Sequence, residues 1–285
     1  MADPRDPAIV MHVYGGPAFA TRAGWSKLLG RLDRLFTGHP LRVVRIGSRP
    51  RPHAGVPYRE NLPRLLKALA RGQLGHFQAK DSVYGAVGLW YSKAGAGPAQ
   101  TPGEGLECLN VALDLRLLGE GEALQAGESL FSLLADAYQL LRASFACLRP
   151  GQKLDLAMFG GSVLIRRGAP SPDMGYWVAL PRDLGEAIPT IEWATILCPR
   201  HLEQFASLGG FESVARLFSS SRVHSLPDGS ALVVLQASVI EFQADPGHTG
   251  KLAELNRLCG TFSSRIVAQD AGKPTPWFLA PGSRP

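Results

Sequence analysis

The sequence predicts an α+β protein in which a mixed, largely antiparallel sheet packs with helices. Segments with strand-like and helix-like spacing of apolar residues interleave irregularly, without the strict strand–helix repeat of a parallel barrel. A hydrophobic content of 45% and a charged content of 19% are those of a globular chain with a sizeable core. The 32 glycines and 22 prolines predict many turns but are too few for a disordered chain.

The first half of the chain alternates between the two kinds of element. Short apolar or alternating runs predict strands at residues 9–14, 41–46, 83–92 and 108–118. Apolar residues spaced by three and four predict helices at 24–37, 62–72 and 128–148. Asn61 is the expected cap of the second helix, with Pro63 in its first turn. Glycine- and proline-broken loops are expected at 47–57 and 94–105.

The second half continues the mixed pattern. Strands are predicted at 154–159, 163–167, 176–180, 190–197, 222–226 and 230–240. Helices are predicted at 199–207, 211–218 and 250–262, and a proline-rich tail at 271–285. We therefore expect one large domain over 1–285, with a possible internal boundary in the loop 94–105.

The cysteines and the apolar segments of the chain predict its cellular location. Cys108, Cys147, Cys198 and Cys259 are widely spaced and lie beside apolar residues, which predicts reduced, mostly buried thiols. No secretory signal is evident, and the apolar run at 231–240 is too short to cross a bilayer. The expected location is the cytoplasm, without membrane contact.

Motifs for catalysis or cofactor binding are weak. Gly95-Ala96-Gly97 lacks the Lys-Ser/Thr of a phosphate loop, and Gly160-Gly161-Ser162 lacks the final glycine of a nucleophile elbow. The seven histidines never come within ten residues of one another, so no metal-ligand spacing is present. We expect no enzyme activity, cofactor or metal. Of three functional hypotheses for this chain, a hydrolase whose active site is assembled only by the fold ranks last.

Basic and acidic residues are concentrated in different segments of the chain, although the formal net charge is only +6. Residues 1–75 carry thirteen Lys or Arg against four Asp or Glu, whereas residues 104–136 carry seven acids against Arg116 alone. Opposed charge fields are typical of proteins that meet charged macromolecules. The acidic segment fits a basic protein partner and the basic segment fits a phosphate backbone. Each segment could equally be a solvated surface.

Landmark residues in the last third of the chain carry a resemblance. Residues 191–197 read IEWATIL, and they are followed by Pro199, His201-Leu202, Leu208-Gly209-Gly210 and Asp228-Gly229. In these landmarks the segment 191–262 resembles the immunity-protein family of type VI secretion systems, whose members are encoded beside polymorphic toxins. TsiT-type members, partners of a restriction-endonuclease-like DNase toxin, are similar in size.

The resemblance implies a small cytoplasmic α+β inhibitor that binds one cognate toxin, here a nuclease effector, and blocks it by covering its surface. Such a family has no catalytic residues to carry over. We expect Trp193 to anchor the core and Pro199 to start a helix. Gly209 and Gly210 are expected to end a helix. One departure stands out: an inhibitor of a basic nuclease should be acidic, whereas this chain has a pI of about 9.3.

The candidate site residues follow from these two charged segments. The expected partner-binding residues are acids of the acidic segment and two aromatic anchors: Glu104, Glu107, Glu120, Glu122, Glu128, Asp136, Trp90 and Tyr91. The alternative hypothesis is a nucleic-acid-binding module that uses Arg42, Arg45, Arg49, Arg51, Arg59, Arg64, Lys67 and Arg71. It ranks second because no aromatic residues or recognised nucleic-acid motif accompany these arginines.

Overall fold

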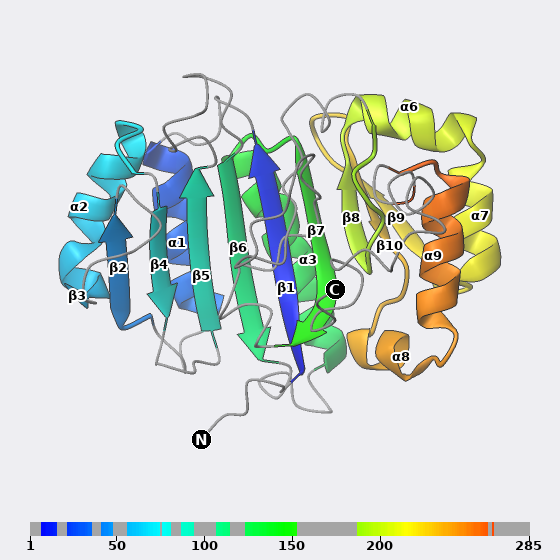
Figure 1. The fold of residues 1–285 in the computed structure, drawn as a ribbon, viewed down its shortest axis with the longest axis horizontal. Helices are drawn as coiled ribbons and strands as arrows, with labels where there is room; N and C mark the ends of the chain where they lie inside the picture. The colour runs from blue at the N-terminus through cyan, green and yellow to red at the C-terminus, as the bar shows by residue number, and fades with distance from the viewer. Residues whose placement is uncertain are drawn as a thin grey trace, which may run out of the picture.

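A computed structural model describes residues 7–15, 22–35, 41–47, 56–74, 76–80, 87–93, 107–114, 123–152, 187–261 and 264. Across these residues ten strands form one sheet in the order β3-β2-β4-β5-β6-β1-β7-β8-β10-β9 (Figure 1). Every neighbouring pair in that order is antiparallel. With helices packed on this sheet, the predicted α+β class is confirmed.

The strands are β1 (Pro7–Gly15), β2 (Val43–Gly47), β3 (Val56–Pro57), β4 (His76–Lys80), β5 (Val87–Lys93), β6 (Glu107–Asp114), β7 (Phe145–Gln152), β8 (Ala194–Leu197), β9 (Arg222–Ser225) and β10 (Ala231–Val234). The helices of the described residues are α1 (Arg22–Leu35), α2 (Tyr58–Ala70), α3 (Ala123–Leu140), α6 (Pro199–Ser207), α7 (Gly210–Leu217), α8 (Val239–Ala244) and α9 (His248–Leu258).

The helices fall into two groups. α1, α2 and α3 lie behind the sheet in Figure 1, and α1 packs against both α2 and α3. The other four helices gather around β8, β10 and β9 at the opposite end of the sheet, where α6 packs on β8 and α7 packs on α9. The N-terminal and C-terminal parts of the chain therefore each supply one helical layer.

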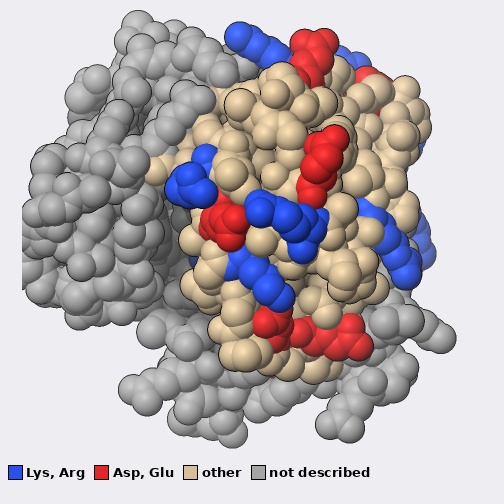
Figure 2. All heavy atoms as spheres, turned by 90° about the vertical axis from the view of Figure 1, so that its right-hand side faces the viewer, with Lys and Arg blue, Asp and Glu red and all other residues tan. Residues whose placement is uncertain are grey.

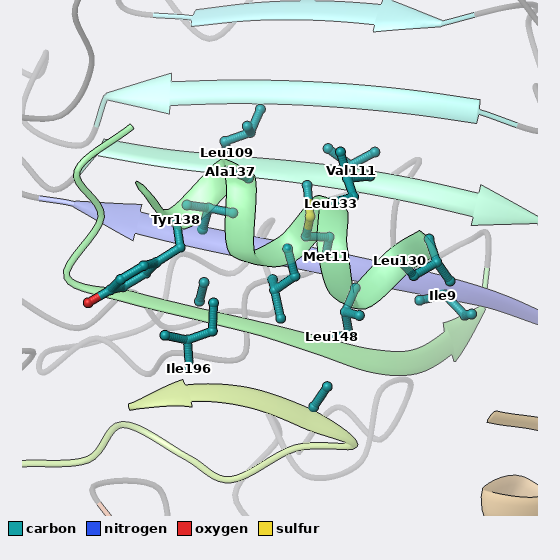
Figure 3. Packing of buried hydrophobic residues seen from close by; sticks show 14 of the residues in the cluster. Ile9, Met11, Leu109, Val111, Leu130, Leu133, Ala137, Tyr138, Leu148 and Ile196 are labelled. Atoms are coloured by element: carbon teal, nitrogen blue, oxygen red, sulfur yellow. The ribbon is translucent and has the colours of Figure 1, made fainter. Parts of the chain in front are cut away.

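The core is a layer of apolar side chains between α3 and the middle of the sheet (Figure 3). On α3, Leu130, Leu133 and Ala137 are buried against Met11 of β1 and Leu148 of β7. Side chains alternate between the two faces of a strand, so Ile9, Met11 and Val13 face the helix while His12 and Tyr14 face the other way. The buried run of β1 thus has two chemically different faces.

The helix predicted at 128–148 is too long at its C-terminal end. α3 ends at Leu140, and Phe145 begins β7. Arg142 adopts a left-handed backbone with φ 50°, and the Ala143 N–H donates to the Tyr138 carbonyl oxygen at 2.9 Å. This pattern closes a helix in a Schellman motif, usually with glycine at the left-handed position. An arginine there hid the stop from the sequence.

Two further predictions need correction. The strand predicted at 230–240 ends at Val234, because Ser238 caps α8 by accepting a hydrogen bond from the Glu241 N–H at 3.3 Å. Asn61 is no cap, since α2 begins at Tyr58 and Asn61 donates to the Pro57 carbonyl oxygen at 2.8 Å. Strand β4 was not predicted.

Other expectations lie outside the described residues. They are the loop 94–105, the strands at 154–159, 163–167 and 176–180, and the tail 271–285. Among the described helices, none combines the length and the apolar composition needed to cross a membrane.

Candidate partner-binding surfaces

Five of the eight expected partner-binding residues have no described side chain. Glu104, Glu120 and Glu122 lie outside the described residues. Glu128 in α3 and Trp90 in β5 are placed in their elements, but only their backbone is described. The acidic segment as a whole therefore stays a prediction.

Glu107 and Tyr91 lie inside the protein. Their exposed fractions are 6% and 3%, and the Tyr91 hydroxyl donates to Glu107 Oε2 at 2.8 Å across the β5–β6 pair. Burial, reinforced by the negative charge of Glu107, raises the pKa of Tyr91. Neither side chain forms the exposed contact that the sequence predicted, because the alternation of two adjacent strands turns both inward.

Asp136 of α3 is also engaged within the chain. It forms an ion pair with Arg31 of α1, and Arg31 also donates to Ser132 Oγ at 2.7 Å. Both partners are partly exposed. Asp136 thus ties α1 to α3, and its charge is largely balanced before any partner arrives.

The basic residues of α2 are placed very differently. Arg59, Arg64, Lys67 and Arg71 are all exposed, while Leu65, Leu66 and Leu69 on the other side of the helix are buried. Arg42 is exposed beside the start of α2, where its carbonyl oxygen accepts a hydrogen bond from the Tyr58 N–H at 2.8 Å. Arg45 is described by its backbone alone, and Arg49 and Arg51 lie outside the described residues.

Helix α1 carries two further exposed cations. Lys27 and Arg34 are exposed on α1, which packs beside α2. Asp33 faces Arg59: partial burial raises the pKa of Asp33, and the nearby arginine charge lowers it in part. We call the exposed set Lys27, Arg34, Arg42, Arg59, Arg64, Lys67 and Arg71 the basic face.

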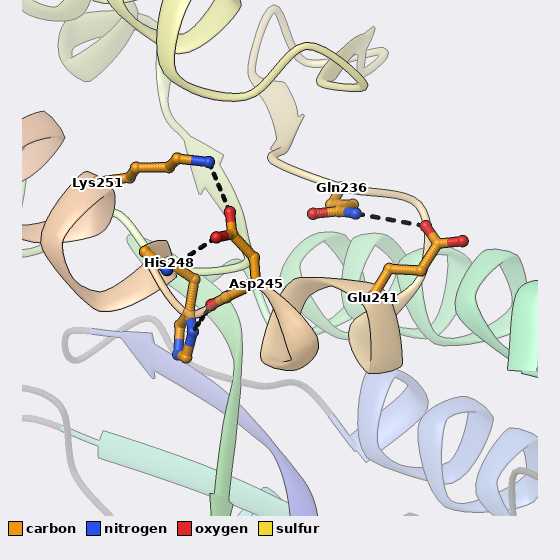
Figure 4. A network of polar contacts seen from close by, with 6 residues as sticks. Gln236, Glu241, Asp245, His248 and Lys251 are labelled. Atoms are coloured by element: carbon orange, nitrogen blue, oxygen red, sulfur yellow. Dashed lines mark hydrogen bonds and ion pairs between the residues drawn. The ribbon is translucent and has the colours of Figure 1, made fainter.

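The C-terminal helices have mixed charge. Figure 2 views this end of the molecule and shows Lys/Arg and Asp/Glu side chains interspersed. Arg216 of α7 pairs with Glu254 of α9 at 3.2 Å, and Lys251 pairs with Asp245 at 2.6 Å (Figure 4). Hydrogen bonds from Lys251 and from the Gly247 N–H lower the pKa of Asp245. Two of the four cations on these helices, Arg216 and Lys251, are thus paired with acids in the described part of the chain.

A buried polar cluster on β1, β6 and β7 was missed at the sequence level. His12 is fully buried; its Nδ1 lies 2.5 Å from Asn110 Oδ1, and Arg149 Nε donates to its Nε2 at 3.2 Å. Since Nε2 accepts, His12 is neutral with its proton on Nδ1. Burial, and then the Arg149 charge, lower the pKa of His12 well below 6.5. The signal was a histidine interrupting an apolar strand.

This cluster lies on the sheet face opposite α3. Cys147, directly across from His12, and the nearby Cys108 are buried thiols. Burial raises the pKa of Cys108 to about 12 and that of Cys147 well above 9.0, so both stay protonated and poorly nucleophilic. Across the described residues, no three His, Cys, Asp or Glu side chains are grouped as metal ligands.

Comparison with known proteins adds a structural likeness. The fold is similar to that of the type VI secretion system (T6SS) protein PA0821 of Pseudomonas aeruginosa. The TM-score is 0.53 with 13% sequence identity, over 89% of this chain and 72% of that chain. At this identity the likeness concerns the fold. Neither a protein-family model nor a curated protein sequence matches the chain.

The landmark residues of the last third have the structural roles expected of them. Trp193 is fully buried, lies 5.1 Å from Phe131 between ring centroids, and donates from Nε1 to the Gln236 carbonyl oxygen at 2.7 Å. Pro199 opens α6, and Gly209, with φ 66°, separates α6 from α7. These residues organise the fold.

Proposed function

We propose that this chain is a cytoplasmic immunity protein that binds a cognate T6SS toxin and neutralises it by covering its surface. The observation that carries the proposal is the fold likeness to a T6SS protein over 89% of the chain. The tryptophan, proline and glycine landmarks, which resemble those of the immunity family, support it from the sequence. The proposal assigns the chain no catalytic step, cofactor or metal.

Inhibition of this kind requires a rigid body with a complementary outer surface. Here one ten-stranded sheet supports both helical layers, so that the backbones of α1 and α2 are held in fixed positions. A preorganised surface binds without a large loss of conformational entropy. The toxin expected from the resemblance is a nuclease effector.

The test is protection followed by isolation of the complex. Each T6SS effector of the source strain is produced in a sensitive host with and without this chain, and surviving cells are counted. We expect the chain to rescue growth against one effector and to co-elute with that effector in size-exclusion chromatography. Rescue against none of them would overturn the proposal.

Nucleic-acid binding is the second candidate function, and exposed cations on α2 favour it. Arg64, Lys67 and Arg71 project from one side of the helix, as a phosphate-tracking surface requires. A 25-base-pair duplex in a filter-binding assay tests this function directly. Tight binding whose affinity falls steeply with salt, together with no protection from any effector, would favour it over the immunity proposal.

A further inference from the structure

We propose that the basic face is the toxin-contact surface, and that its occupant is an acidic surface of the toxin protein. This inference rests on the proposed immunity function and replaces the acidic segment with a cationic one as the leading contact. It also accounts for the pI of about 9.3, which is opposite to that expected for an inhibitor of a basic enzyme.

The geometry of α2 holds the cations outward. Arg64, Lys67 and Arg71 follow one another at intervals of three and four residues, so they share one side of the helix. The opposite side is fixed in the core by the buried Leu65 and Leu69. A partner therefore meets a row of positive charge on a rigid element, which favours defined register over loose attraction.

The charges of the basic face are also poorly balanced from within. Between their bounds, α1 and α2 carry seven Lys or Arg against two acids, Asp33 and Glu60. In the described part of the chain, Arg64, Lys67 and Arg71 form no ion pair, whereas Arg59 lies near Asp33 and Arg31 of α1 is paired with Asp136. Like charges gathered on one side of a helix produce a long-range field that speeds encounter with an oppositely charged partner.

Two features favour a protein over a nucleic acid as the occupant. The aromatic residues of α1 and α2 are Trp25 and Tyr58, and both are buried, so neither helix offers a stacking platform for bases. Val56, 38% exposed beside the start of α2, provides an apolar contact of the kind that protein interfaces use.

The experiment compares two double variants with the same change of charge. Arg64→Glu with Arg71→Glu reverses two charges of the basic face. Arg200→Glu with Arg257→Glu reverses two exposed charges on the C-terminal helices, and in the described part of the chain neither of these arginines forms an ion pair. Binding to the effector identified by protection is followed by biolayer interferometry. Matched unfolding midpoints verify that each variant folds.

We expect the Arg64/Arg71 variant to associate about 10- to 100-fold more slowly at low salt, and the Arg200/Arg257 variant to associate at the wild-type rate. The difference should largely vanish at 1 M salt, where the Debye length is about 3 Å. A variant with Arg64→Gln and Arg71→Gln removes the two charges without reversing them, and it should show a smaller reduction of the association rate. It replaces the glutamate variant if that variant does not fold.

The outcomes separate this inference from the function on which it rests. Protection with equal association rates for both double variants overturns the basic face as the contact and leaves the immunity function standing. If no effector is neutralised, binding is measured on poly-L-glutamate and on the 25-base-pair duplex. Retention on poly-L-glutamate lost only in the Arg64/Arg71 variant supports an acidic protein partner. Preference for the duplex overturns it in favour of nucleic acid.

Discussion

The two helical layers of this protein handle surface charge in opposite ways. α1 and α2 carry seven Lys or Arg against two Asp or Glu, whereas α6, α7, α8 and α9 together carry four of each sign. The C-terminal layer joins neighbouring helices through pairs such as Arg216–Glu254. In the described part of the chain, two of the four cations on the C-terminal helices are paired with acids, whereas none of the three cations between the bounds of α2 forms an ion pair.

Removing the aromatic anchor of the N-terminal layer should destabilise the protein more than any other substitution considered. Trp25 of α1 packs edge-on against Phe77 and Tyr91, with ring centroids 5.8 Å and 5.4 Å away. We expect Trp25→Ala to lower the free energy of unfolding by about 3–5 kcal/mol, because it opens a large cavity. Urea denaturation measures this. A loss below about 1 kcal/mol would mean that α1 is not anchored through this residue.

A glycine in the C-terminal layer gives the next largest effect. A Cβ atom on Gly210 would lie 2.6 Å from Phe205, which is fully buried and packs edge-on against Phe211. Gly210→Ala should therefore cost about 1–3 kcal/mol of unfolding free energy. It should leave toxin association unchanged if the contact lies on the basic face.

Gly250 provides the matched control for that substitution. It lies in α9, and a Cβ atom there would meet nothing within 4 Å. Gly250→Ala should be neutral or stabilising by up to about 1 kcal/mol, because alanine reduces the entropy of the unfolded chain. Equal destabilisation by both substitutions would contradict the packing argument at Phe205.

The sheet shared by both layers should respond to pH through His12. Its pKa in the folded protein is depressed well below 6.5, so below pH 6.5 the unfolded chain binds more protons than the folded one. The unfolding free energy should then fall as the pH decreases, by up to about 1.4 kcal/mol per pH unit from this residue.

His12→Gln isolates that contribution because it removes the ionisable group and leaves its neighbours in place. Denaturation at pH 7.5, 6.5 and 5.5 should show a flatter pH dependence for the variant than for the wild type. Parallel curves would indicate that His12 titrates normally in the folded protein.

The smallest effects concern single surface charges. Arg216→Ala removes an exposed ion pair and should cost less than about 1 kcal/mol. Arg64→Ala should be close to neutral, because it relieves repulsion from Lys67 but also removes the attraction of Glu60 one turn earlier. The melting temperatures of the two variants, measured at two ionic strengths, compare these effects. Destabilisation by Arg64→Ala as large as that by Arg216→Ala would contradict the charge contrast between the layers.

Much of the fold was predictable because local patterns and tertiary environment agree. The strand at 9–14 and the helices at 24–37, 199–207 and 211–218 match β1, α1, α6 and α7 closely. The α8 start was also readable, since Ser238 followed three positions later by Glu241 is a capping pattern. The end of α3 was hidden because Arg142 takes a conformation that usually signals glycine.

The exposed charges were harder to predict, because the sequence does not show which charged side chains are paired or buried within the fold. Glu107 and Asp136 were grouped with the acidic segment, yet one is buried against Tyr91 and the other pairs with Arg31. Arg64, Lys67 and Arg71 were recognised as one helix face, and their exposure agrees with that grouping. The polar cluster at His12 joins residues that lie about one hundred positions or more from His12 in the chain. No local sequence pattern could therefore predict it.

The position of β1 has a consequence for biosynthesis. This first strand lies between β6 and β7, so both of its edges await segments that begin at Glu107 and Phe145. At translation rates of about 5–20 residues per second, the nascent strand spends about 5–20 s on the ribosome before its first neighbour is made. Ile9, Val10 and Met11 are then an apolar segment without a sheet, a natural substrate for a chaperone that holds nascent chains.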